Sequence, residues 1–75
     1  MLTAQQVIDT YYLEARCMAL EIAALFDRHD AAAARDGQPA PAPQKLEVLR
    51  EAMAVLAENG QTDRTETLLS IFGKI

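Results

Sequence analysis

Residues 3–35 read TAQQVIDTYYLEARCMALEIAALFDRHDAAAAR, and this stretch decides the fold of the 75-residue chain. Its apolar residues recur alternately three and four positions apart, a spacing that places them in a row along one face of an α-helix. This row, which we call the first stripe, consists of Ile8, Tyr11, Ala15, Met18, Ile22, Leu25, His29 and Ala32. The alanines at residues 31–34 favour continuation of the helix to Arg35. The pattern predicts one long helix over residues 3–35.

A second row of apolar residues has the same spacing on roughly the opposite side of this helix. The second row consists of Leu13, Cys17, Leu20 and Ala24, while Tyr12, Ala19 and Phe26 widen the first stripe. Apolar residues on two sides of a helix need neighbours on two sides. We therefore expect contacts on both sides of the long helix, and we interpret Cys17 as a small buried thiol.

Capping residues and prolines mark the ends of the long helix and of the segment that follows. Thr3 with Gln6 forms a capping-box pattern at the start, and Gly37 can end the helix in the left-handed conformation. Prolines follow at positions 39, 41 and 43. They predict a Pro-rich, semi-rigid connector over residues 37–43.

Two shorter helices are predicted after the connector. The first covers residues 43–59, with Pro43 in its first position and Gly60 as its terminator. Its apolar face consists of Leu46, Leu49, Met53 and Leu56, broadened by Val48, Ala52 and Val55. The second covers residues 63–72 and is expected to be capped by Thr62, or by Asp63 in a capping box with Glu66.

These patterns predict an all-α protein with a single helical domain over residues 1–75. The long helix spans about 50 Å, and we expect the two shorter helices to lie antiparallel to it along one side. Cys17 is the only cysteine, so no disulfide within the chain can stabilise so small a core. We expect self-association to cover the other side and complete a helical bundle, in a homodimer or a dimer of dimers. The residues expected at this oligomer interface are Ile8, Tyr11, Tyr12, Ala15, Met18, Ile22 and Leu25.

The charged residues of the long helix lie between its two apolar sides. None has an opposite charge three or four positions away, the spacing at which ion pairs form within a helix. One polar edge, which we call the charged edge, contains Glu14, Glu21 and Arg28, and a second contains Asp9, Arg16 and Asp30. Another helix, another subunit or water must therefore satisfy these charges.

Composition excludes several classes of partner. The net charge is -4, and the seven basic residues are scattered rather than clustered, so we expect no nucleic acid as a partner. Acidic residues interrupt the apolar stretches of the long helix, so we expect no membrane insertion. The first ten residues lack the basic start and apolar core of a signal peptide, which favours a cytoplasmic location.

Carboxylates that face the interior of a helical bundle form ferritin-like metal sites. Candidate metal ligands in this chain are Glu14, Glu21, His29 and Asp30. The Glu-x-x-His motif of such sites is absent. A site would need symmetric copies of Glu14 or Glu21 to meet at a two-fold axis.

The sequence gives no arrangement typical of catalysis. Cys17 and His29 are separated by roughly 18 Å of helix, which excludes a Cys–His dyad within one chain. We expect no cofactor, and no enzymatic activity unless a metal supplies it. The sequence predicts a small non-catalytic oligomeric helical protein, a structural or protein-interaction (adaptor) module that binds itself or another protein. The alternative is a ferritin-like metal-binding helical bundle with carboxylate ligands at a subunit interface.

Overall fold

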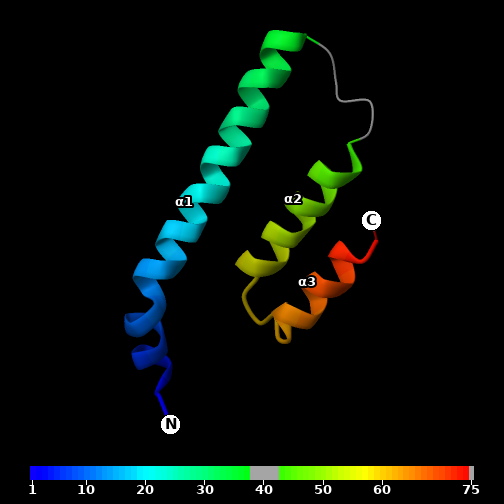
Figure 1. Cartoon of the computed structure of the whole chain (residues 1–75). Helices are drawn as coiled ribbons and strands as arrows, with labels where there is room; N and C mark the ends of the chain where they lie inside the picture. Colours follow the sequence, from blue (N-terminus) through cyan, green and yellow to red (C-terminus); the bar gives the residue numbers. More distant parts are fainter. Residues whose placement is uncertain (38–42, 75) are drawn as a thin grey trace. The chain divides into compact units, whose positions relative to one another are not determined.

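The computed structural model describes residues 1–37 and 43–74, and every regular element in them is a helix. In chain order the helices are α1 (Ala4–Asp36), α2 (Gln44–Ala57) and α3 (Arg64–Phe72), as Figure 1 shows. The predicted all-α class is confirmed. The interior of the predicted connector, residues 38–42, lies outside the described residues. The chain divides into two units, Met1–Pro39 and Ala40–Ile75, and each is described by itself.

The first turn of α1 is held by the predicted capping box. The Gln6 N–H donates to the Thr3 hydroxyl over 3.1 Å, and the Thr3 N–H donates to Oε1 of Gln6 over 2.8 Å. These bonds satisfy backbone donors that a helix start otherwise leaves unpaired. They set the start of α1 at Ala4, one residue after its cap.

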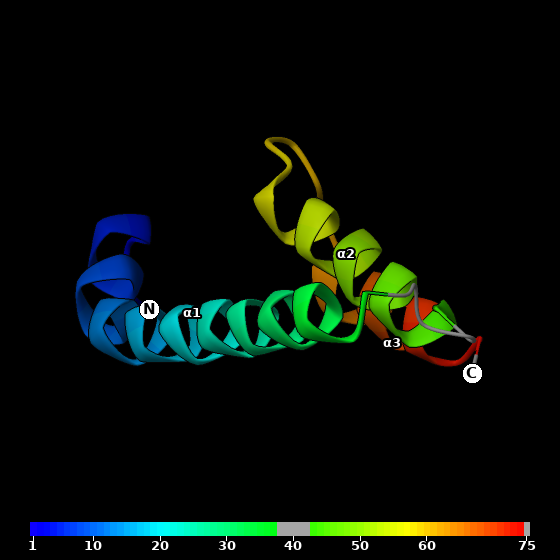
Figure 2. The same ribbon diagram turned by 90° about the horizontal axis from the view of Figure 1, so that it is seen from above.

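The last turn of α1 ends at the predicted glycine. Gly37 has φ 68°, and its N–H donates to the Ala33 carbonyl over 3.0 Å. Side chains are strained at such a positive φ, so glycine suits this position. Between these ends α1 is one uninterrupted helix, and its first turns curve away from the line of the rest in Figure 2.

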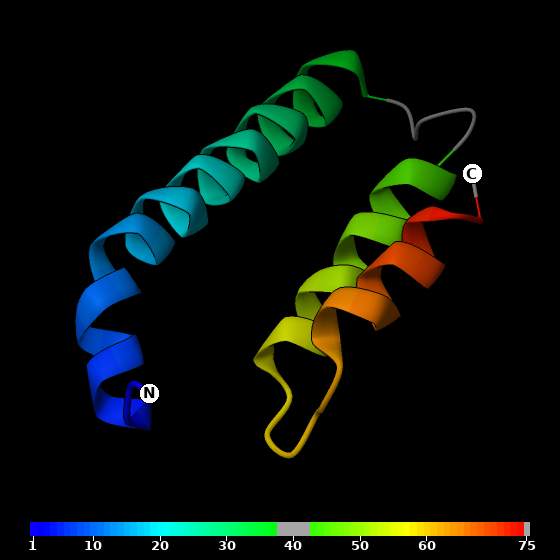
Figure 3. The ribbon, with the colours of Figure 1, turned by 60° about the horizontal axis from the view of Figure 1, so that its bottom comes forward.

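The second unit is an antiparallel helical hairpin of α2 and α3, which lie side by side in Figures 1 and 3. The Arg64 guanidinium at the start of α3 donates to the Glu58 carbonyl, at the end of α2, over 2.8 Å. Past the end of α3, Lys74 Nζ lies 3.3 Å from Oε1 of Glu51. The ion pair is exposed and adds little stability, and both contacts agree with the opposite directions of the two helices.

The end of α2 differs from the prediction. The helix stops at Ala57 rather than Asn59, because Glu58 takes an extended conformation with ψ 127°. Its carbonyl then points out of the helix and accepts the bond from Arg64. Gly60, with φ 81°, lies in the turn after the helix and not at its immediate end. Pro43 precedes the first helical residue instead of occupying that position.

The predicted capping box at the start of α3 is wrong. Asp63 does occupy the N-cap position, but its φ is 53° and its side chain makes no capping hydrogen bond. An N-cap side chain normally reaches the first amides from an extended backbone, which Asp63 does not adopt. Its carbonyl instead accepts bonds from both the N–H and the hydroxyl of Thr67, each over 3.0 Å.

The core of the hairpin is small. Within the described part of the chain, the buried side chains are those of Val48 and Ala52 on α2 and Ile71 on α3. The predicted main row of α2 is less covered, since Leu46, Leu49 and Met53 are half-buried and Leu56 is exposed. The two helices therefore meet through the residues that were expected only to broaden the apolar side of α2.

Enlarging Ala52 should destabilise the hairpin. Ala52 is 0% exposed, so Ala52→Leu forces extra volume into a filled space and should lower the free energy of unfolding by about 1–3 kcal/mol. Urea unfolding followed by circular dichroism measures the change. Ala54→Leu, at an exposed position of the same helix, is the matched control. Equal unfolding midpoints for the two variants would contradict the assigned core.

Candidate functional site

The apolar residues of α1 form the most extensive candidate site in the described residues. No residue of α1 is buried. Exposed fractions on the first stripe include 60% for Ile8, 52% for Tyr11 and 52% for Met18. An apolar surface of this extent marks an interaction site more often than a free surface.

The predicted interface residues share this exposure, with one exception. Tyr12, Ala15 and Leu25 are exposed, whereas Ile22 is half-buried. All seven lie on α1, whose continuity keeps them in one line along the first stripe and its flank. The structure thus places them on one helix face, and their role at an oligomer interface stays a prediction.

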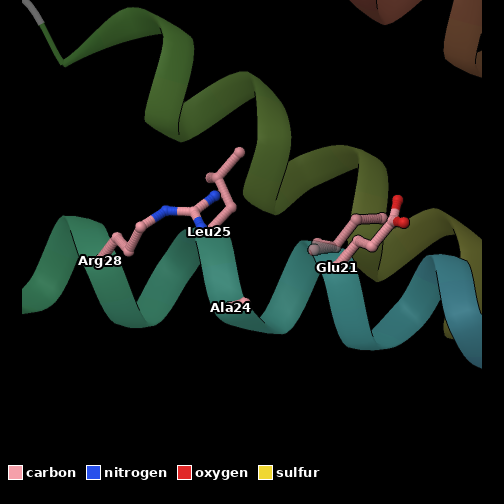
Figure 4. A pocket seen from close by; sticks show the side chains of 5 residues that line it. Glu21, Ala24, Leu25 and Arg28 are labelled. Carbon is pink, nitrogen blue, oxygen red and sulfur yellow. The ribbon is translucent and has the colours of Figure 1, made fainter.

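A shallow hollow lies on the surface of α1 where the charged edge meets the first stripe. It is lined by Glu21, Ile22, Ala24, Leu25 and Arg28. Figure 4 shows the side chains of Glu21, Leu25 and Arg28 projecting from the same side of the α1 ribbon. The hollow therefore has an apolar centre, with an acidic residue at one end and a basic residue at the other. It can receive an apolar side chain whose own neighbours carry the opposite charges.

This hollow was not anticipated from the sequence. Ala24 was assigned to the second row, but it also lines the hollow, because its methyl group leaves space between larger neighbours. The feature of the sequence that could have indicated the hollow is Ala24, a small residue between Glu21 and Arg28. These two charges are seven positions apart and so lie on the same edge of the helix.

The candidate metal ligands are not gathered into a site. Among the residues that the structure describes, no group of three or more His, Cys, Asp or Glu side chains is placed to hold a metal ion. His29 Nδ1 lies 3.0 Å from Oδ1 of its neighbour Asp30. Glu14 and Glu21 are exposed and two turns apart on the charged edge. A carboxylate site would therefore require ligands from more than one chain.

The interpretation of Cys17 as a buried thiol is wrong for the single chain. Cys17 is free and exposed. Its second-row neighbours Leu13 and Leu20 are exposed as well, at 67% and 54%. Spacing predicts which residues share a face, but burial also needs a neighbouring element, which spacing within one helix does not reveal.

No helix in the described ranges has the length and apolar character needed to cross a membrane. Comparison with protein-family models, curated proteins and solved structures gives no match to this chain.

Metal analysis tests the carboxylate alternative directly. Because the described ligands of one chain do not converge, protein purified without chelator should contain no stoichiometric divalent ion. A Glu14→Gln/Glu21→Gln variant should give the same content by inductively coupled plasma mass spectrometry. Stoichiometric metal in the wild type that is lost in the variant would contradict this expectation.

Proposed function

We propose that this protein is a small non-catalytic structural module that associates with a copy of itself through the first stripe of α1. In the proposed assembly, α2 and α3 lie antiparallel to α1 on its other side and complete a helical bundle. The observation that carries the proposal is the exposure of apolar residues along the whole of α1, none of which is buried.

The small core of the chain supports this proposal. The three buried residues of the hairpin give a core well below what a domain of this size needs. Covering the first stripe with a second copy would bury about 800 Å² per partner, the usual size of a specific interface. A two-fold contact is also self-complementary, so one surface serves both chains.

Apolar residues of the hairpin that lie outside its core support the proposed packing of α2 and α3 against α1. Leu56, Leu69 and Phe72 remain exposed at 45%, 69% and 41%. The second row of α1 is also uncovered, so the two surfaces are of matching apolar character. A free, exposed Cys17 is compatible with the reducing cytoplasm that we propose as the location.

The association state provides the main test. Sedimentation equilibrium at micromolar concentration should give a mass near twice the 8.2 kDa of one chain. The melting temperature should fall on dilution, because dissociation is linked to unfolding. A mass of one chain at every concentration, with a melting temperature independent of dilution, would refute the proposal.

A substitution on the first stripe tests whether this surface, rather than another part of α1, forms the interface between the two chains. Ala15→Phe adds a ring at a contact between helices and should weaken the dimer by about 1–3 kcal/mol. Ala23→Phe is the matched control, because Ala23 is exposed and belongs to neither apolar row. Dissociation constants from sedimentation equilibrium give the comparison. If both variants dimerise like the wild type, the first stripe is not the interface.

A further inference from the structure

We infer that the partner of α1 is a second α1 running antiparallel, in a register fixed by the charged edge; this inference rests on the proposed function. Ile22 and Leu25 are consecutive members of the first stripe and lie between Glu21 and Arg28, where the charged edge changes from acidic to basic. In the inferred register Ile22 lies opposite the partner's Leu25, and the two-fold axis passes between the levels of Ala23 and Ala24. The helices then overlap over residues 11–36, a length of roughly 39 Å.

The charged edge is acidic in its first half and basic in its second. It continues to Arg35, so that Glu14, Glu21, Arg28 and Arg35 follow one another every seven residues along one flank of the first stripe. Reversing one helix brings the acidic half of each chain beside the basic half of the other. Glu21 then faces the partner's Arg28, and Glu14 faces the partner's Arg35. Two-fold symmetry repeats both contacts, so all these charges are paired.

The hollow on α1 lies where the central contacts of this register fall. Glu21 and Arg28 border it, with Leu25 between them along the helix (Figure 4). Within the described part of a single chain, neither charge makes an ion pair. In the antiparallel pair the partner's Leu25 packs beside Ile22, and each charge gains a partner across the contact.

The other flank of the first stripe matches large side chains with small ones in the same register. It consists of Tyr12, Ala19, Phe26 and Ala33, again every seven residues. Tyr12 faces the partner's Ala33, and Phe26 faces the partner's Ala19. A ring lies against a methyl group each time, which fills the space without overpacking. Charge and size, two independent properties, thus agree on one register.

A parallel pair lacks these matches. In a parallel coiled coil, each charged-edge residue lies beside the opposite flank of the partner. Glu21 would then lie against the partner's Phe26, and Arg28 against the partner's Ala33. Both charges would lose water without gaining an opposite charge, which is unfavourable. The antiparallel direction is therefore preferred.

Paired charge reversals test the register. Glu21→Arg brings two arginines together at each contact and Arg28→Glu brings two glutamates together, so each variant alone should dimerise about tenfold more weakly. An equimolar mixture restores opposite charges in the heterodimer, which should exceed the statistical half in native mass spectrometry. The double variant Glu21→Arg/Arg28→Glu should recover the wild-type dissociation constant in sedimentation equilibrium. Asp9→Arg, at an exposed acid of the second polar edge of α1 and outside the overlap of the two helices, is the control and should change nothing.

Spin labels give the direction of the helices independently of the charges. A label at exposed Thr10, in a Cys17→Ala background, lies far from the two-fold axis. Double electron–electron resonance should give a separation of about 40 Å or more for an antiparallel pair and roughly 20 Å for a parallel one.

The outcomes distinguish the register from the proposed function. A wild-type protein that stays a single chain would overturn both. A dimer with close Thr10 labels, and with charge variants that assemble like the wild type, would overturn the antiparallel register and leave self-association standing.

Discussion

The apolar surface of α1 is exposed to water in the single chain, and this exposure links the other features of the molecule. A helix of 33 residues with apolar rows on two sides cannot cover itself, and none of its residues is buried. The hairpin of α2 and α3 has a core of only three buried residues. Hydrophobic burial dominates the favourable part of folding, so covering the surface of α1 is the main favourable contribution that the proposed assembly adds.

The sequence predicted α1 well because its two ends depend on residues within a few positions of one another. Thr3 and Gln6 satisfy each other's backbone donors, and Gly37 closes the last turn without help from elsewhere. The end of α2 was predicted less well. Glu58 leaves the helix, and its carbonyl accepts a hydrogen bond from Arg64 across the turn. This contact joins two helices, so the spacing of apolar residues within either helix does not predict it. The left-handed Asp63 belongs to the same turn.

The sequence predicted part of the candidate site. Spacing placed Tyr11, Met18 and Leu25 in one row, and all three lie exposed on α1. Spacing could not predict the hollow beside them, since it depends on how the side chains around Ala24 fill space. It also placed Cys17 in an apolar row, but burial is decided by the surroundings of a row, and in the single chain Cys17 is exposed.

The placement of charges on α1 sets how the protein responds to ionic strength. In the described residues, the contacts of α1 between basic and acidic side chains join immediate neighbours: His29 contacts Asp30, and Arg35 forms an ion pair with Asp36. Pairs three or four residues apart, which strengthen many isolated helices and weaken as salt screens them, are absent from this helix in the described residues. Added salt therefore has little to screen within α1, and in the proposed assembly screening acts chiefly on the pairs that Glu14 and Glu21 form with Arg35 and Arg28 of the partner chain.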